Sequence, residues 1–336
     1  MPEHKLTDDL FEVENQLHSG KEVISTKPIS YWGDSWRRLK QNKGAIVGLV
    51  LIILIILLAI LGPYMNDHEF DEQNLQISNM PPKVPVLEHV PFLNLNGTDI
   101  NGVDIYEAEN VEGYYWFGTD NLGRDVWTRI WEGTRISLYI AFLAALLDLL
   151  IGVTYGSISA YYGGRVDNVM QRIIEVLIGV PNLIVIILLI LILQPGIMSI
   201  TLAMVITGWV NMARIIRGQV LKLKGQEFVL ASRTLGAGDT RLIWRHLIPN
   251  SMGPIIITTM FTIPTAIFTE AFLSFIGLGL QPPIASLGTI VNDGFELIQI
   301  YPHMLMFSSI IISLIMISFN LLGDGLRDAF DPKMRK

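Results

Sequence analysis

The chain has 336 residues, of which 51% are hydrophobic and only 16% are charged, and its mean hydropathy is +0.45. This composition excludes a large soluble core and indicates an integral membrane protein. The formal net charge of −7 comes largely from one segment, because 13 of the 31 acidic residues lie between positions 63 and 134. We expect no nucleic-acid partner, and the absence of cysteine excludes disulfide and thiolate chemistry.

The N-terminal residues 1–43 are polar and are predicted to form a cytoplasmic tail. Residues 1–28 carry many charges and few aromatic side chains, a composition typical of disorder. From position 31 onward, Trp32 and Trp36 are interleaved with basic residues, which predicts an amphipathic interfacial helix in the lipid headgroup layer. No cleavable signal pattern precedes the first apolar span, so this span is expected to act as an uncleaved insertion signal.

Six apolar segments are long enough to cross a hydrocarbon layer about 30 Å thick. They are residues 44–61, 136–162, 173–193, 197–212, 252–278 and 303–322. The fourth segment is short, so five spans are the alternative count. We predict an all-α integral membrane protein with six transmembrane helices, comprising a first helix at 44–62 and a five-helix core at 135–324.

Lysine and arginine are distributed unevenly among the segments that connect these spans. Alternate connections contain 20 of the 24 basic residues, and the others contain 4. Because basic loops are retained in the cytoplasm, both termini and the loop at 213–251 are predicted to be cytoplasmic. The acidic segment at 63–134 is then a long extracytoplasmic loop, and residues 325–336 form a short cytoplasmic tail.

The acidic loop contains two recognisable parts. Residues 80–91 are too rich in proline for a helix and are predicted to be extended. Residues 117–129, near its end, are predicted to form a short surface helix that Thr119 or Asp120 caps.

The predicted spans contain a few polar and small residues that need an explanation. Asp148 lies at mid-span, whereas Glu270 lies toward the outer boundary. Such residues mark functional sites or are satisfied by neighbouring helices, and we favour helix-to-helix hydrogen bonding or the wall of a wet translocation path. A proton relay through Asp148 in an ion-coupled secondary transporter is the alternative. Gly152 and Gly156 are four residues apart, a spacing that favours close helix packing.

The loop at 218–250 has the features of a rigid protruding element. Residues 227–235 have helical spacing. One face of this predicted helix is an apolar stripe formed by Phe228, Ala231 and Leu235. A stripe of this kind suits docking into a partner, and a solvated connector is the alternative.

Two glycines and two further residues delimit the predicted helices of this loop. Gly236 stands where a left-handed residue commonly closes a helix. Gly238 keeps the turn open, and Asp239 is predicted to be the N-cap of a second helix. Pro249 is predicted to end that second helix.

Motifs that carry chemistry are absent from the sequence. It contains no phosphate-binding G-x-x-x-x-G-K-[ST], no H-E-x-x-H, no G-x-S-x-G and no histidines at metal-ligand spacing. We therefore expect no enzymatic activity, no ATP hydrolysis by this chain and no bound cofactor or metal.

The loop at 218–250 also resembles the sequence pattern of a known family. Residues 230–232, Gly236 and residues 246–249 resemble the EAA-type cytoplasmic coupling loop of binding-protein-dependent ABC importers. The acidic residue of that pattern is missing here, and Glu227 stands about one turn earlier.

Further segments resemble one branch of these importers, the oligopeptide/dipeptide (nickel) transport family. They are residues 117–138, before the second span, and 270–283, at the outer end of the fifth. The resemblance extends over about residues 30–330 and is to the C-type permease subunit.

This resemblance implies a type I ABC importer fold in a bacterial plasma membrane. It implies a second homologous permease, two cytoplasmic ATP-binding subunits that hold ATP and Mg, an extracytoplasmic peptide-binding protein and surrounding membrane lipids. Cargo could be an oligopeptide, a dipeptide, a nickel chelate or a signalling peptide. The residues expected to couple the chain to the ATPases are Glu227, Phe228, Ala231, Ser232, Arg233, Leu235, Gly236, Ala237, Gly238, Asp239 and Pro249.

Overall fold

The computed structural model describes residues 31–85, 89, 95–99 and 102–331, and in these residues the only regular secondary structure is helical. The α-helices are α1 (Tyr31–Gln41), α2 (Lys43–Leu61), α3 (Ile105–Ala108), α4 (Val126–Tyr162), α5 (Gly164–Gly179), α6 (Asn182–Leu193), α7 (Ile197–Leu223), α8 (Glu227–Thr234), α9 (Asp239–Arg241), α10 (Ile248–Asn250), α11 (Met252–Phe275), α12 (Leu287–Glu296) and α13 (Pro302–Phe330). A π-helix, Leu242–Leu247, joins α9 to α10. The predicted disorder at 1–28 lies outside the described residues.

Five long apolar helices in the described part of the chain are able to cross a membrane, namely α2, α4, α7, α11 and α13. A sixth span exists only if α5 and α6 are counted together, and these two helices meet at 82°. The apolar span predicted at 173–193 is therefore divided between two helices, the end of α5 and α6. Pro181 explains the break, because a proline disfavours helical geometry at the preceding residue, and Val180 is extended.

Helix α4 begins earlier than the sequence pattern predicts. Asp125 caps it by accepting a hydrogen bond from the Thr128 backbone N–H at 2.8 Å. Residues 126–134, predicted to belong to the loop, thus form the first turns of α4. The separate surface helix capped at Thr119 or Asp120 is also wrong, because Asp120 instead accepts backbone hydrogen bonds within the turn that precedes α4.

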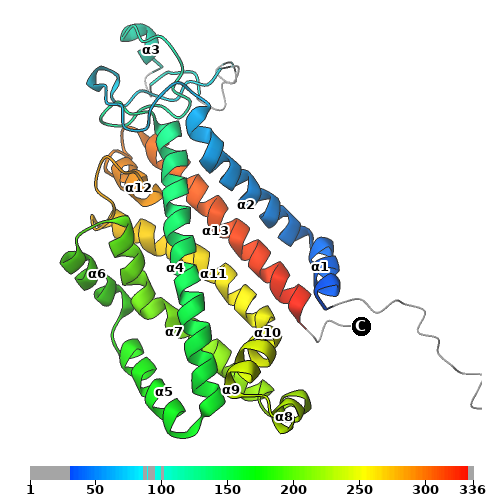
Figure 1. The fold of residues 1–336 in the computed structure, drawn as a ribbon. Helices are drawn as coiled ribbons and strands as arrows, with labels where there is room; N and C mark the ends of the chain where they lie inside the picture. The colour runs from blue at the N-terminus through cyan, green and yellow to red at the C-terminus, as the bar shows by residue number, and fades with distance from the viewer. Residues whose placement is uncertain (1–30, 86–88, 90–94, 100–101, 332–336) are drawn as a thin grey trace, which may run out of the picture.

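The long helices of the bundle lie against one another (Figure 1), and glycines allow some of them to approach closely. A Cβ on Gly156 would lie 2.3 Å from the Ala213 carbonyl oxygen, and one on Gly152 would lie 2.6 Å from the Met212 Cβ. Gly152 and Gly156 therefore lie at the α4–α7 crossing, where only glycine lets the backbones approach this closely. Helix α13 packs in the same manner on α2, where a Cβ on Gly325 would lie 2.2 Å from the Ala45 Cβ.

Helix α1 forms where the amphipathic pattern predicts it. Leu39 is buried, while Trp32 and Trp36 expose about half of their surface. The Trp32 ring lies edge-on to Phe330 at the end of α13, with 5.7 Å between the ring centroids.

The segment between α2 and α4 folds into a cap at one end of the bundle (Figure 1). Ile77, Met80 and Tyr106 form its small buried core. The Tyr106 hydroxyl donates a hydrogen bond to the Pro81 carbonyl at 2.9 Å, and burial raises the pKa of this hydroxyl above its ordinary value. The described part of residues 80–91 contains no α-helix, in agreement with the prediction.

Candidate functional site

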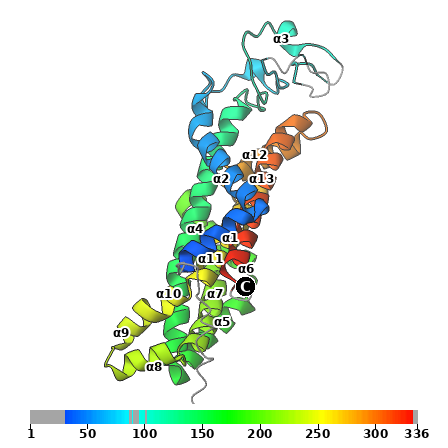
Figure 2. The ribbon, with the colours of Figure 1, turned by 90° about the vertical axis from the view of Figure 1, so that its right-hand side faces the viewer.

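Residues 227–250 form a protruding helical arm, which comprises α8, α9, the π-helix and α10. Figure 2 shows the arm projecting sideways from the bundle. Val229 anchors α8, because its side chain is fully buried in a cluster with Leu242 and Leu247. The predicted apolar stripe is left uncovered, since Phe228 is 40% exposed and Leu235 is 88% exposed. The described part of the chain therefore leaves Leu235 almost uncovered and covers Phe228 only in part.

Gly236 closes α8 in the predicted manner. Its φ angle is +84°, in the left-handed region that favours glycine. The Ala237 backbone N–H donates to the Ser232 carbonyl at 3.0 Å, and the Gly236 N–H donates to the Arg233 carbonyl at 3.0 Å. These bonds satisfy carbonyl groups that the end of the helix would otherwise leave unpaired.

The second helix of the arm differs from the prediction at both ends. Gly238 is its N-cap and Asp239 is its first residue, so the Asp239 carboxylate makes no capping bond. Pro249 does not end the helix, because helical turns continue to Asn250. The π-helix just before Pro249 explains how the chain tolerates it, since widening the helix relieves the clash between a proline ring and the preceding turn.

Tyr161, near the end of α4, contacts α8 and α9 of the arm. Its hydroxyl donates to the Asp239 Oδ1 at 2.6 Å and accepts from the Arg233 Nη2 at 3.3 Å. The Arg233 guanidinium also lies over the Tyr161 ring, 5.5 Å from its centroid. Just before the arm, the Lys224 Nζ donates a hydrogen bond to the Ala160 carbonyl of α4 at 2.7 Å. Sequence patterns alone do not reveal Tyr161, because this contact joins residues 78 positions apart.

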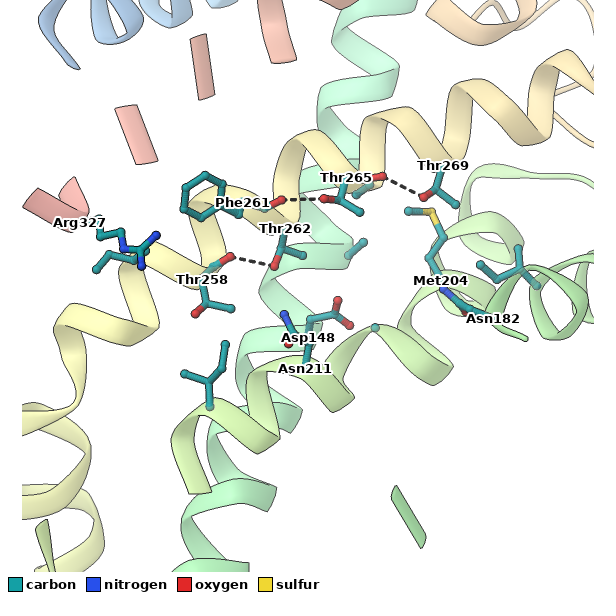
Figure 3. A pocket seen from close by; sticks show the side chains of 16 residues that line it. Asp148, Asn182, Met204, Asn211, Thr258, Phe261, Thr262, Thr265, Thr269 and Arg327 are labelled. Carbon is teal, nitrogen blue, oxygen red and sulfur yellow. Dashed lines mark hydrogen bonds between the residues drawn. The ribbon is translucent and has the colours of Figure 1, made fainter. Parts of the chain in front are cut away.

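A cavity of about 400 Å³, the central cavity, lies beside the middle of α4 and is bounded by α4, α6, α7, α11 and the end of α13. It opens at the surface, where Asn182, Asn211 and Arg327 are exposed. Its polar lining residues are Asp148, Asn182, Asn211, Thr258, Thr262, Thr265, Thr269 and Arg327. In Figure 3, Asp148 and Asn211 project toward the face of α11 that carries the threonines. The remaining lining residues are apolar side chains and Gly208.

The acidic residues predicted inside the spans have different environments. Asp148 lines the cavity and is only 6% exposed, and its Oδ1 atom has no hydrogen-bond partner among the described residues. Glu270 is fully buried away from the cavity, where Ser137 and Ser274 each donate a hydrogen bond to its carboxylate at 2.8 Å. Ser137 belongs to α4, so Glu270 joins α11 to α4.

A cluster of four charged side chains lies where the cap meets the bundle. It consists of Asp120, Arg124, Arg129 and Asp293, beside a pocket of about 310 Å³. Arg129 approaches the carboxylates of Asp120 and Asp293, each at 3.3 Å, and Arg124 approaches Asp120 at 2.7 Å. Burial raises the pKa of Asp293, while both guanidinium groups oppose the rise. Arg129 and Asp120 are almost completely buried, so the cluster fixes the cap on the bundle.

No group of three or more histidine, cysteine or acidic side chains that could hold a metal ion occurs in the part of the chain that the structure describes. The candidate sites in the described residues are the exposed apolar stripe on the arm, the central cavity and the charged cluster beneath the cap.

The chain matches two protein families. Residues 152–336 match the family described as binding-protein-dependent transport system inner membrane component. Residues 30–82 match the N-terminal TM domain of oligopeptide transport permease C.

Individual relatives give the same result. The oligopeptide transport system permease protein OppC of Bacillus subtilis is 47% identical over 328 residues, covering 98% of each chain. The dipeptide transport system permease protein DppC of the same organism is 44% identical over 334 residues, covering 99% of this chain and 95% of that protein. The inward-facing MetNI methionine ABC transporter is a more distant structural neighbour, with 17% identity and a TM-score of 0.49 over 59% of this chain and 94% of that chain.

These matches extend over nearly the whole chain and confirm the family resemblance drawn from the arm and its flanking segments. The chain belongs to the family of inner membrane components of binding-protein-dependent transport systems.

Proposed function

We propose that this membrane permease subunit imports peptides and is driven by ATP hydrolysis on partner subunits. Relatives that match it along nearly their whole length are oligopeptide and dipeptide permeases, which supports a peptide cargo. The observation that carries the coupling proposal is the arm, on which the described part of the chain leaves Phe228 and Leu235 exposed. An apolar stripe on a rigid protruding helix is suited to a groove on another protein.

The proposed topology places both termini and the arm in the cytoplasm. The bias of 20 basic residues against 4 between alternate connections supports this orientation. In Figure 1 the arm, α1 and the end of α13 all lie away from the cap that carries α3, as this topology requires. The cap is then extracytoplasmic, and we propose that it docks the peptide-binding protein.

The arm is proposed to insert into one of two cytoplasmic ATP-binding subunits, which hold ATP and Mg. The stripe of Phe228, Ala231 and Leu235 would line the contact, with the turn from Gly236 to Asp239 at its tip. The flanking coupling residues are Glu227, Ser232, Arg233, Ala237, Gly238 and Pro249. A second, homologous permease would present the corresponding arm to the other ATPase. No cofactor is proposed for this chain itself.

Tyr161 supports a route for mechanical coupling. Its bonds to Arg233 and Asp239 fix the arm to the end of α4, and Val229 packs the arm against the same region. Because packed helices move as rigid bodies, displacement of the arm by the ATPase would shift α4 and α7 together. Both helices line the central cavity, so such a shift would open the cavity to alternate sides of the membrane.

Gentle affinity purification of the tagged chain tests this proposal. We expect a second permease and two P-loop ATPases to co-purify, and peptide uptake by the reconstituted complex to require ATP and the binding protein. Uptake that persists without ATP and follows an ion gradient would instead support the ion-coupled carrier that uses Asp148. Isolation of the chain alone from a crosslinked preparation would contradict the coupling role of the arm.

A further inference from the structure

The central cavity contains a carboxylate that the protein leaves uncompensated. Asp148 is only 6% exposed, its Oδ1 has no hydrogen-bond partner, and it forms no ion pair with any described residue. Of the described residues that line the cavity, it is the only acidic one. A buried carboxylate of this kind is costly unless a cation or a proton neutralises it.

The space around Asp148 is adapted to its carboxylate. Gly208 of α7 faces it, and a Cβ added at Gly208 would lie 2.3 Å from Oδ2 and 2.8 Å from Cγ. Any larger residue at 208 would therefore displace the carboxylate. The absence of a side chain at this position lets α7 approach α4 while the acid remains at the cavity wall.

The opposite wall supplies hydrogen-bond acceptors. The hydroxyl groups of Thr262, Thr265 and Thr269 donate to the backbone carbonyls four residues earlier, at 2.8–3.0 Å (Figure 3). Since each hydroxyl hydrogen is already used, the oxygen lone pairs are the groups left for a ligand. The wall and Asp148 together favour a ligand that carries a positive charge and several N–H donors.

We infer that Asp148 binds the α-ammonium group of the peptide within the membrane cavity. An ammonium has three donors and a full charge, so it can pair with the carboxylate and with hydroxyl oxygens at once. This inference rests on the proposed peptide cargo and identifies which end of the peptide the permease recognises. The recognition is independent of any selection that the external binding protein makes.

The absence of cysteine from the chain permits a direct test. Ile257 lines the cavity, is partly exposed and has no polar group for the ligand, so Ile257→Cys introduces a single thiol in this chain as a reporter. The whole complex is placed in nanodiscs without the binding protein, and alkylation of the thiol by a neutral maleimide is timed. Trialanine and N-acetyl-trialanine, which differ in the charge of the N-terminus, are the protecting ligands.

We expect trialanine to protect the thiol at a concentration about tenfold lower than its acetylated form. Asp148→Asn, which keeps the side-chain shape, should remove this preference by weakening trialanine alone. Gly208→Ala should have the same effect by displacing the carboxylate. Asp324→Asn makes the same chemical change at an exposed carboxylate of α13 outside the cavity, so it is the matched control and should keep the preference. An unchanged alkylation rate without peptide verifies that each variant cavity is intact.

Equal protection by the two peptides in the parent protein, a preference that survives Asp148→Asn, or no protection by trialanine would each overturn the inference. Peptide uptake by the complete parent transporter, measured in parallel, separates this outcome from failure of the proposed function. ATP-driven uptake without an Asp148-dependent preference contradicts the ammonium site alone. Absence of any peptide uptake contradicts the proposed cargo as well.

Discussion

Gly236 and Gly225 illustrate how one backbone angle separates a required glycine from a replaceable one. A Cβ added at either glycine would meet no atom within 4 Å, so space is not limiting at either site. Of the two, only Gly236 has a left-handed φ, of +84°. It lies in the turn that joins α8 to α9. A side chain at Gly236 is therefore strained by the backbone, whereas one at Gly225 is not.

Gly236→Ala is expected to destabilise the turn by about 1 kcal/mol and to reduce peptide uptake. Gly236→Pro is expected to abolish uptake, because proline cannot adopt this φ and also lacks the N–H that donates to Arg233. The membrane-inserted amount of each variant should stay normal. Uptake by reconstituted complexes, with Gly225→Ala as the control, measures the effect, and normal uptake by Gly236→Pro would contradict the docking role.

Single residues also show what a sequence can and cannot predict. Gly236 is predictable because a helix and its closing glycine are neighbours in the chain. Tyr161 and Gly208 are not, since their importance depends on Asp239 and Asp148, which belong to other helices and meet them only after folding. The burial of Val229 is not predictable for the same reason, because it depends on Leu242 and Leu247.

At the scale of helices, the Tyr161 hydroxyl is the contact that links α4 to both helices of the arm. Tyr161→Phe removes the hydroxyl and keeps the ring under Arg233. We expect the variant to assemble and to hydrolyse ATP, but to transport fewer peptides per ATP, because the arm would move without carrying α4. A loss of about 1 kcal/mol from one hydrogen bond is the energetic scale.

The ratio of peptide uptake to ATP hydrolysis in proteoliposomes measures this coupling. Tyr162→Phe is the matched control, since Tyr162 follows directly in the chain and is exposed. An unchanged ratio in Tyr161→Phe, or an equal fall in both variants, would show that coupling does not pass through this hydroxyl.

Helix positions follow from local patterns more reliably than helix continuity does. Apolar length locates all five long helices, and local spacing with a closing glycine locates both ends of α8. The break at Pro181 and the continuation through Pro249 depend on how neighbouring turns accommodate a missing N–H, one by a sharp bend and the other by a π-helix. Apolar composition alone cannot distinguish these two responses to proline.

At the scale of the whole molecule, α4 connects all three candidate sites. Its 37 residues extend about 55 Å, from Arg129 beneath the cap, past Asp148 at the cavity, to Tyr161 at the arm. A continuous helix of this length can transmit displacement between its two ends only if each end is firmly attached. The charged cluster provides that attachment at the cap, as Tyr161 does at the arm.

Arg129→Met tests the attachment at the cap. The substitution leaves Asp120 and Asp293 with Arg124 as their shared cation, so one partner of a buried network is lost. We expect the protein to lose about 3 kcal/mol of stability. The cap should also become easier to cleave by protease, because the cluster joins it to α4 and α12.

Arg135→Met is the appropriate control, because Arg135 pairs with Glu132 on the exposed side of the same helix, and such pairs contribute at most about 1 kcal/mol. Thermal unfolding in detergent and limited proteolysis of the cap measure both variants. Because the cluster closes the extracytoplasmic end of α4 in the proposed topology, Arg129→Met should also weaken stimulation of the ATPase by the binding protein. Equal stability losses in the two variants would mean that burial of the cluster does not fix the cap, and α4 would then be anchored by its apolar packing alone.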